Sequence, residues 1–135
     1  MASFRRLSLA DLFLDTLPYN AHSTAVDALW AGVPVLTTRG TTFASRVAAS
    51  ALHAAGLPEL VTDSLQAYEA RALELAGNPA ELAELKERLK RDRRSQPLFD
   101  TARFTRHLEN AYITMWERYQ RGEPPAHFSV PRVEG

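Results

Sequence analysis

The segment LFLDTLPYNAHSTAVDALWAGVPVLT, residues 12–37, contains two short apolar runs separated by a helix-length stretch. Residues 12–14 and the β-branched run VPVLT at 33–37 are typical of short strands buried on both faces. Between them, residues 23–31 place apolar side chains at spacings of three and four, which favours a helix. Gly32 and Pro34 then match the usual exit from a helix. This order predicts a β-α-β unit of a parallel sheet with a right-handed crossover.

The remaining sequence continues the alternation and then becomes helical. We expect a helix at 43–55, capped by Thr42 and with Phe43 turned inward, and a short strand at 59–61. Further helices are predicted at 65–76, 79–94 and 101–121. The last one carries an apolar stripe, which we interpret as core: Phe104, Leu108, Ala111, Tyr112, Met115, Trp116 and Tyr119. We expect residues 1–122 to form one partial lobe and residues 123–135, which contain three prolines, to form a tail.

Composition excludes several functions. The chain has 135 residues, with 16 Lys and Arg against 16 Asp and Glu, and its formal net charge is +0. Nucleic acid is therefore not an expected partner, because its binding needs an excess of basic residues. The absence of Cys excludes disulfides and suits a cytoplasmic location. No apolar run is long enough to span a membrane, and the four His residues lack metal-ligand spacing, so neither a membrane nor a metal is expected.

Polar residues gather at the turn that leads from the first strand into the first helix. In open α/β sheets ligands bind at this edge, and the unpaired amides of a helix start favour anions such as phosphate. Ser23 and Thr24 add hydroxyl donors, His22 adds an imidazole, and Asp27 lies one turn further on, where a carboxylate suits a ribose diol. Together these residues are typical of a nucleotide site. An ordinary N-cap, with Ser23 or Thr24 satisfying the helix amides, is an equal alternative from spacing alone.

Three stretches extend this interpretation by resemblance. They are residues 11–37, residues 40–61 (GTTFASRVAASALHAAGLPELV) and residues 96–119 (QPLFDTARFTRHLENAYITMWERY). They closely resemble the C-terminal part of the protein O-linked N-acetylglucosamine transferases and the related SPINDLY-type proteins, and the likeness extends from Leu9 to Phe128. It implies the α/β fold of a partial, Rossmann-like C-terminal lobe of a GT-B glycosyltransferase, with a short parallel sheet flanked by helices and a helical C-terminal region.

The resemblance also implies roles for individual residues. His22, Ser23 and Thr24 correspond to the family's diphosphate-binding step and Asp27 to its ribose-binding Asp. The family's donor-sugar loop falls on Pro18, Tyr19 and Asn20, and Thr42 and Arg46 are possible secondary site residues. No catalytic residue is assigned. Ala21 replaces a usual Gly, and it would be strained if this position needed a positive φ.

The function implied is transfer of N-acetylglucosamine from UDP-GlcNAc to Ser or Thr of acceptor proteins by an inverting mechanism, with no cofactor and no metal. In a complete protein the partners would be an N-terminal catalytic lobe and tetratricopeptide repeats. Because that lobe and the base-reading segment would precede Met1, we expect this chain to be inactive alone. Alternatives are GDP-fucose as donor, and a non-catalytic fragment or truncated paralogue that packs on a partner as an interaction module.

Overall fold

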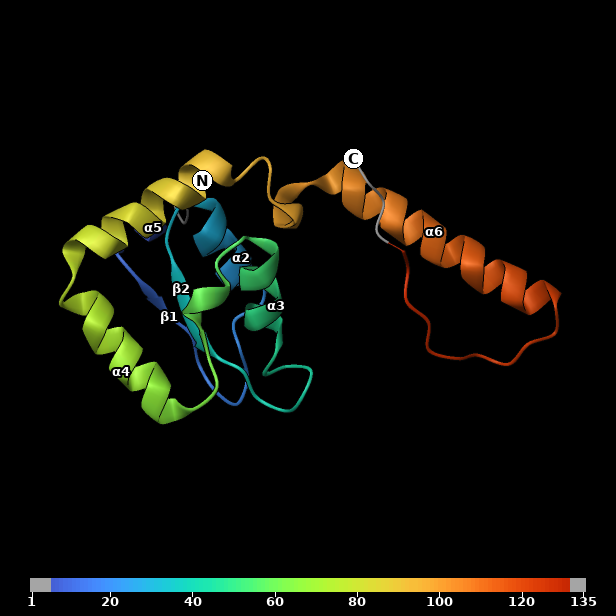
Figure 1. The fold of residues 1–135 in the computed structure, drawn as a ribbon, viewed down its shortest axis with the longest axis horizontal. Coiled ribbons are helices and arrows are strands. Elements are labelled where there is room, and N and C mark those ends of the chain that lie inside the picture. Colours follow the sequence, from blue (N-terminus) through green and yellow to red (C-terminus); the bar gives the residue numbers. More distant parts are fainter. Residues whose placement is uncertain (1–5, 132–135) are drawn as a thin grey trace. The chain divides into compact units, whose positions relative to one another are not determined.

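Three short parallel strands, β1 (Phe13–Leu14), β2 (Val35–Thr38) and β3 (Val61–Thr62), lie in that order in the computed structural model, which describes residues 6–131 (Figure 1). Phe13 pairs with Val35 and Thr38 pairs with Thr62. All four residues of β2 are buried, because this central strand has a neighbour on each edge and helices on each face. The predicted β-α-β order of a parallel sheet is confirmed.

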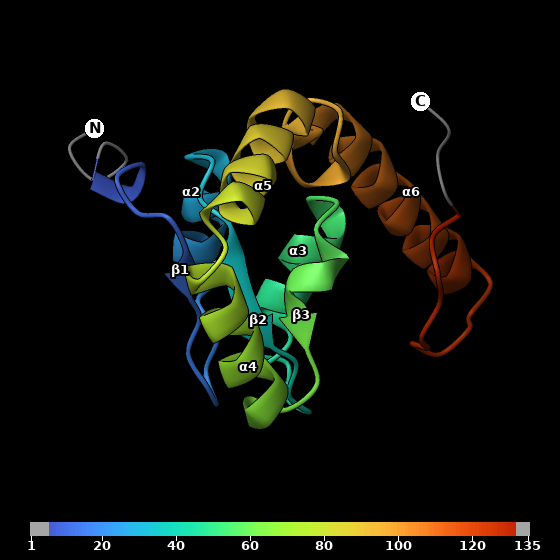
Figure 2. The same ribbon diagram turned by 60° about the vertical axis from the view of Figure 1, so that its left-hand side comes forward.

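Helices cover both faces of this sheet. Helices α2 (Ser23–Trp30) and α3 (Val47–Ala54) lie on one side, and α4 (Leu65–Ala76) lies on the other (Figures 1 and 2). Helix α5 (Pro79–Asp92) follows α4 and packs against both α4 and α2. A short 3₁₀ helix, η1 (Pro58–Leu60), occupies most of the segment predicted as the third strand, which begins only at Val61.

Helix ends follow the chemistry expected from the sequence. The side chain of Ser64 accepts a hydrogen bond from the Ala67 N–H at the start of α4, and the side chain of Asn78 does the same for Glu81 at the start of α5. Gly32 and Gly56, which follow α2 and α3, have positive φ values of 82° and 75°. Glycine adopts this conformation without the strain that a Cβ would bring, so both positions terminate their helices cleanly.

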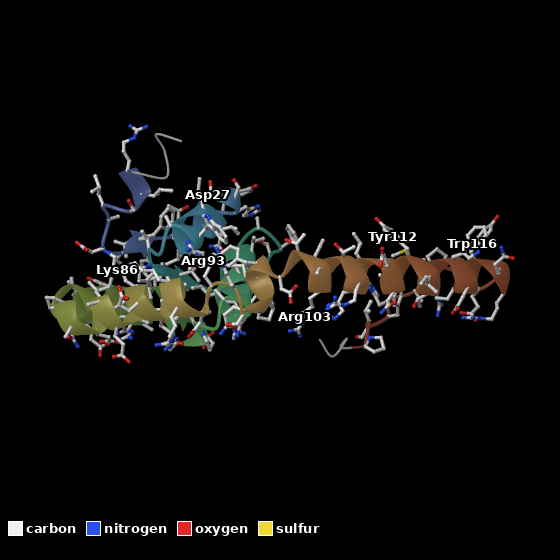
Figure 3. The ribbon with its side chains drawn as sticks, turned by 90° about the horizontal axis from the view of Figure 1, so that it is seen from above. Asp27, Lys86, Arg93, Arg103, Tyr112 and Trp116 are labelled. Carbon is white, nitrogen blue, oxygen red and sulfur yellow. The ribbon has the colours of Figure 1, made fainter. Side chains whose placement is uncertain are left out.

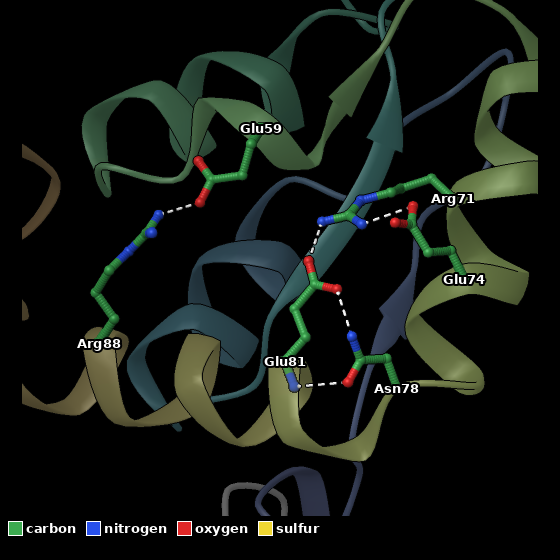
Figure 4. A network of polar contacts seen from close by, with 6 residues as sticks. All are labelled: Glu59, Arg71, Glu74, Asn78, Glu81 and Arg88. Carbon is green, nitrogen blue, oxygen red and sulfur yellow. Dashed lines mark hydrogen bonds and ion pairs between the residues drawn. The ribbon is translucent and has the colours of Figure 1, made fainter.

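Ion pairs connect α5 to α4 and to η1 (Figure 4). Arg71 of α4 contacts Glu74 of its own helix and Glu81 of α5. Arg88 of α5 pairs with Glu59 of η1. Because these groups are partly exposed, each pair contributes at most about 1 kcal/mol and serves mainly to fix which helix faces meet.

Helix α3 begins later than its sequence predicts. The helix expected from residue 43 starts at Val47, and the Phe43 side chain is 82% exposed rather than inward. The reason is a tight local turn in which the Thr42 and Ser45 hydroxyls bond to each other at 2.9 Å, and the Ser45 hydroxyl also donates to the Thr42 carbonyl. These local bonds compete with helical ones and hold residues 42–45 as a loop.

The chain forms two compact units, one ending at Leu98 and the other beginning at Phe99. The second contains helix α6 (Thr101–Gln120), preceded by the 3₁₀ helix η2 (Pro97–Phe99) and followed by a tail whose Pro124 carbonyl accepts a hydrogen bond from Arg118. The expected boundary between lobe and tail at residue 122 stays a prediction. The division at residue 98 separates two compact units and does not say where the catalytic lobe of the family ends.

No residue of α6 is buried within its own unit, so the expectation that its apolar stripe is core stays a prediction. The side chains of Tyr112 and Trp116 project from the same helix (Figure 3), both are 60% exposed, and the Trp116 ring stacks on Tyr119, with ring centroids 5.6 Å apart. The amphipathic period is present, but the unit that contains α6 supplies no layer that buries it. None of the helices within residues 6–131 combines the length and apolar character that crossing a bilayer requires.

Candidate functional site

Asp15 follows β1 directly and fixes the turn that leads into α2. Its backbone N–H donates to the Leu36 carbonyl, which extends the β1–β2 pairing by one residue. One carboxylate oxygen accepts the Ala21 N–H at 2.7 Å, and the other accepts the Thr37 hydroxyl at 2.6 Å. The residue is only 8% exposed, so both short bonds compensate a buried negative charge.

The loop between Asp15 and Ala21 is stabilised by its own polar side chains. The Thr16 hydroxyl donates to the Tyr19 carbonyl at 2.8 Å, and the Asn20 side-chain amide donates to the Thr16 carbonyl at 3.0 Å. The Asn20 backbone N–H also donates to the Ala44 carbonyl at 3.0 Å, which joins this loop to the one before α3. Asn20 is 1% exposed and its side-chain oxygen has no hydrogen-bond partner. Pro18 and Tyr19, by contrast, face outward.

Helix α2 begins without a side-chain cap. His22 is the N-cap residue, and no side chain accepts a hydrogen bond from the first-turn amides. Ser23 and Thr24 lie inside the helix and are exposed, so the ordinary N-cap alternative, in which one of these hydroxyls satisfies the amides, is wrong. The start of α2 therefore presents unpaired N–H donors and about half a positive charge, the combination that binds anions.

The backbone at Ala21 is unstrained, although the resemblance made a positive φ conceivable there. Within the described range, no residue other than glycine has a positive φ. Alanine therefore fits this position without conformational cost.

His22 is enclosed by aromatic rings. The Tyr19 ring stacks on the imidazole, with centroids 4.8 Å apart and planes 15° apart, and the Phe43 ring meets it edge-on at 6.3 Å. The Nε2 atom of His22 is buried and has no hydrogen-bond partner. An unpaired buried imidazole nitrogen is costly, so this atom lacks a partner that a ligand group reaching it at the start of α2 would supply.

Asp27 is half-buried and lies one turn into α2 from its start (Figure 3). A carboxylate only accepts hydrogen bonds, and the helix places it on the same element as the anion-binding amides. Its position is therefore compatible with the hydroxyl groups of a ligand whose charged part lies at Ser23.

The two secondary residues have different surroundings. The Thr42 hydroxyl is occupied by Ser45, whereas Arg46 lines a cavity of about 760 Å³ with apolar walls from Val26, Phe43 and Val47. That cavity contains none of the residues predicted to bind diphosphate, sugar or ribose. The structure thus brings Tyr19, Asn20 and His22–Thr24 together at the open start of α2 and places Arg46 beside them in a separate hollow.

Three residues of this region were not singled out from the sequence: Asp15, Thr37 and Tyr68. The Tyr68 hydroxyl reaches from α4 to donate to the Asp15 carbonyl at 2.9 Å. Partial burial, followed by the negative charge of Asp15, raises the pKa of the Tyr68 phenol above its ordinary value. An Asp directly after a buried strand was a usable signal for Asp15, but its partners depend on strand register and on a helix 53 residues away.

Known proteins resemble this chain over most of its length. The profile of glycosyl transferase family 41 matches residues 2–108. The chain belongs to this family. It is 43% identical over 127 residues to the probable UDP-N-acetylglucosamine–peptide N-acetylglucosaminyltransferase SEC of Arabidopsis thaliana, a match that covers 93% of this chain and 13% of that protein. The probable UDP-N-acetylglucosamine–peptide N-acetylglucosaminyltransferase SPINDLY of Hordeum vulgare is 40% identical to this chain. That match covers 88% of this chain and 13% of the SPINDLY protein.

A solved structure of the family supports the fold. A mutant of the Thermobaculum terrenum O-GlcNAc transferase superimposes with a TM-score of 0.80 at 42% identity, over 85% of this chain and 22% of that one. The expected fold class, a partial Rossmann-like lobe with a short parallel sheet flanked by helices, is confirmed. The chain thus spans about an eighth of the length of the curated family members it matches.

Proposed function

We propose that this chain forms the donor-binding portion of an inverting protein O-glycosyltransferase that moves N-acetylglucosamine from UDP-GlcNAc to Ser or Thr. The observation that supports this most directly is the start of α2, which has no side-chain cap and lies beside the unpaired Nε2 of His22. Family membership supports sugar transfer, since the relatives compared above are named as N-acetylglucosaminyltransferases.

Each site residue has a chemical role in this proposal. The first-turn amides and the hydroxyls of Ser23 and Thr24 donate to the diphosphate, and Asp27 accepts from the ribose. Pro18 and Tyr19 border the donor sugar, and Asn20, which is 1% exposed, holds this loop in place through its bonds to Thr16 and Ala44. The acceptor hydroxyl attacks the anomeric carbon in line and gives its proton to a base in the rest of the longer protein. The bond from that carbon to the phosphate oxygen breaks, and UDP leaves with the electron pair. Its growing negative charge is stabilised by the helix start and by His22.

The proposal needs no metal, because fixed donors take up the charge of the leaving group. Residues 6–131 contain no cluster of three or more His, Asp or Glu side chains with a metal-binding arrangement. The rest of the catalytic machinery, including an N-terminal lobe, the acceptor site and tetratricopeptide repeats, would belong to a longer protein. We place that protein in the cytoplasm, and we expect no turnover from this chain alone.

Calorimetric titration of the 135-residue chain tests the proposal. UDP is expected to bind with millimolar or tighter affinity. Inorganic pyrophosphate is expected to bind more weakly, because it lacks the ribose hydroxyls whose hydrogen bonds Asp27 accepts. Adenosine, which has the ribose but no phosphate, serves as the control and is expected not to bind.

A second candidate function is a non-catalytic module that packs on a partner, and the uncovered apolar stripe of α6 favours it. The same titration separates the two candidates. Absence of binding by UDP, GDP and pyrophosphate alike would favour the packing module. Because the base-reading segment is expected to precede Met1, this chain should bind UDP and GDP alike, and the choice between UDP-GlcNAc and GDP-fucose is decided by the same titration of the longer protein.

A further inference from the structure

We propose that Asp15 is a positioning residue that sets the backbone entering α2, and that Thr37 holds its carboxylate in place. This inference rests on the proposed function for what the positioned backbone binds. The clamp itself is a property of the ligand-free chain.

The carboxylate lies where four pieces of the fold meet. Its oxygens join the β2 hydroxyl of Thr37 to the Ala21 N–H, at 2.6 and 2.7 Å. The backbone N–H of Asp15 is bonded to β2 and its carbonyl accepts from Tyr68 of α4. A single residue therefore ties β1, β2, α4 and the loop to one another.

The contact to Ala21 falls at the position where orientation matters most. Ala21 immediately precedes His22, the N-cap of a helix that no side chain caps. The direction of the first-turn amides is thus not set by local capping, and the bond from the Ala21 N–H to Asp15 is the last fixed point before them. Displacing binding groups by about 1 Å from a reacting ligand can lower the rate about a hundredfold. The position that this bond gives to the first-turn amides therefore matters for function.

Asp15 does not act as a ligand in this scheme. Both of its oxygens are already occupied, the residue is 8% exposed, and an ionised carboxylate has no proton to donate to phosphate. Its negative charge would repel a diphosphate if it faced one. The charge is instead directed into the sheet and into the loop backbone.

Four variants of the complete 135-residue chain test the clamp. Asp15→Ala removes it, and Asp15→Asn keeps an oxygen for the Ala21 N–H and an amide that can donate to Thr37. Thr37→Val removes the second partner at nearly constant shape. Thr38→Val is the matched control, because Thr38 is a buried threonine on the same strand whose hydroxyl bonds to Thr62 and not to the loop.

The first readout is amide hydrogen exchange without ligand. We expect exchange at the Ala21 N–H, which bonds to Asp15, and at the Val26 N–H, which bonds to the His22 carbonyl, to accelerate about tenfold or more in Asp15→Ala and Thr37→Val, while Asp15→Asn and Thr38→Val stay close to the unmodified chain. Acceleration spread equally over β1, β2 and α4 would mean that Asp15 merely stabilises the fold, and would overturn the proposal. Unchanged exchange at the Val26 N–H in Asp15→Ala would overturn it as well.

The second readout is UDP affinity, which separates this inference from the proposed function. We expect Thr37→Val to bind UDP about tenfold more weakly than Thr38→Val does, at equal thermal stability. Equal UDP affinity of these two variants would overturn the positioning role. If the unmodified chain bound no UDP, the proposed function would fail, and the exchange pattern would still decide whether Asp15 fixes the start of α2.

Discussion

Thr24 is exposed in the first turn of α2, whose amides no side chain caps. A hydrogen bond to a charged group contributes about 1.5–3 kcal/mol, so Thr24→Ala is expected to weaken UDP and pyrophosphate binding about 10- to 150-fold. Thr24→Ser keeps the hydroxyl and should stay within about threefold. Calorimetry measures both ligands, and a change below about threefold in Thr24→Ala would remove the residue from the site.

Asp27 should act on the ribose and not on the diphosphate. Asp27→Ala is therefore expected to weaken UDP binding by about tenfold or more while leaving pyrophosphate binding almost unchanged. In a complete transferase the same change should appear mainly in the KM for the donor. Equal losses for the two ligands would indicate that the carboxylate acts through the helix and not through the sugar.

Tyr68 connects α4 to the Asp15 carbonyl through its hydroxyl, and burial raises its pKa. A raised pKa in the folded state means that the phenol stabilises the fold fully below its unfolded pKa near 10, and that this contribution is lost as the pH rises through the folded value. Tyr68→Phe should cost about 1 kcal/mol at neutral pH. The difference between the two proteins should shrink above pH 10 in denaturant titrations, whereas a constant difference up to pH 11.5 or so would contradict the shift.

At the scale of single elements, the capped helices behave differently from α2. Ser64 accepts the Ala67 N–H at 3.1 Å and begins α4, which packs on β2. Ser64→Ala is expected to lower the free energy of unfolding by about 1 kcal/mol, and Ser64→Asp, which keeps an acceptor, should restore it. Chemical denaturation monitored by circular dichroism provides the measurement. An Ala variant as stable as the Asp variant would show that tertiary packing alone sets the start of this helix.

Local sequence was sufficient for the elements whose signals are local. The helix predicted at residues 65–76 matches α4, and the glycines at 32 and 56 end their helices as expected. Helix α3 was predicted four residues too early, because Thr42 and Ser45 bond reciprocally as at a helix start, yet the residues that follow form a turn and the helix begins only at Val47. The apolar period of α6 correctly predicted a helix, yet periodicity does not say what covers its stripe.

The candidate site also contains residues that local sequence identifies and residues that only strand pairing brings together. The turn after the first strand identified His22, Ser23 and Thr24 as neighbours, because they follow one another along the chain. Asp15 and Thr37 are 22 residues apart, and their contact depends on the register in which β1 pairs with β2. Single-sequence reasoning has no access to that register, so the groups that hold the site were the ones it missed.

At the scale of the whole chain, the core and the candidate site belong to the same unit. Every buried hydrophobic residue of the described chain lies between Ala25 and Leu89, and the site residues lie between Asp15 and Arg46. The unit that begins at Phe99 contributes no buried residue through α6. The two functions proposed above would therefore reside in different units: anion binding in the first, and packing on a partner through the α6 stripe in the second.

A chain ending at Leu98 tests this separation. Residues 1–98 should unfold cooperatively within about 3 °C of the complete chain and should bind UDP with unchanged affinity, because the core and the start of α2 are both retained. A chain ending at Arg121, which removes only the tail, is the control for shortening. The longer chains should also self-associate more at high concentration in sedimentation experiments, since they expose Tyr112, Trp116 and Tyr119. Loss of UDP binding in the 98-residue chain alone would place part of the site beyond Leu98, and loss of cooperative unfolding would show that the first unit depends on the second.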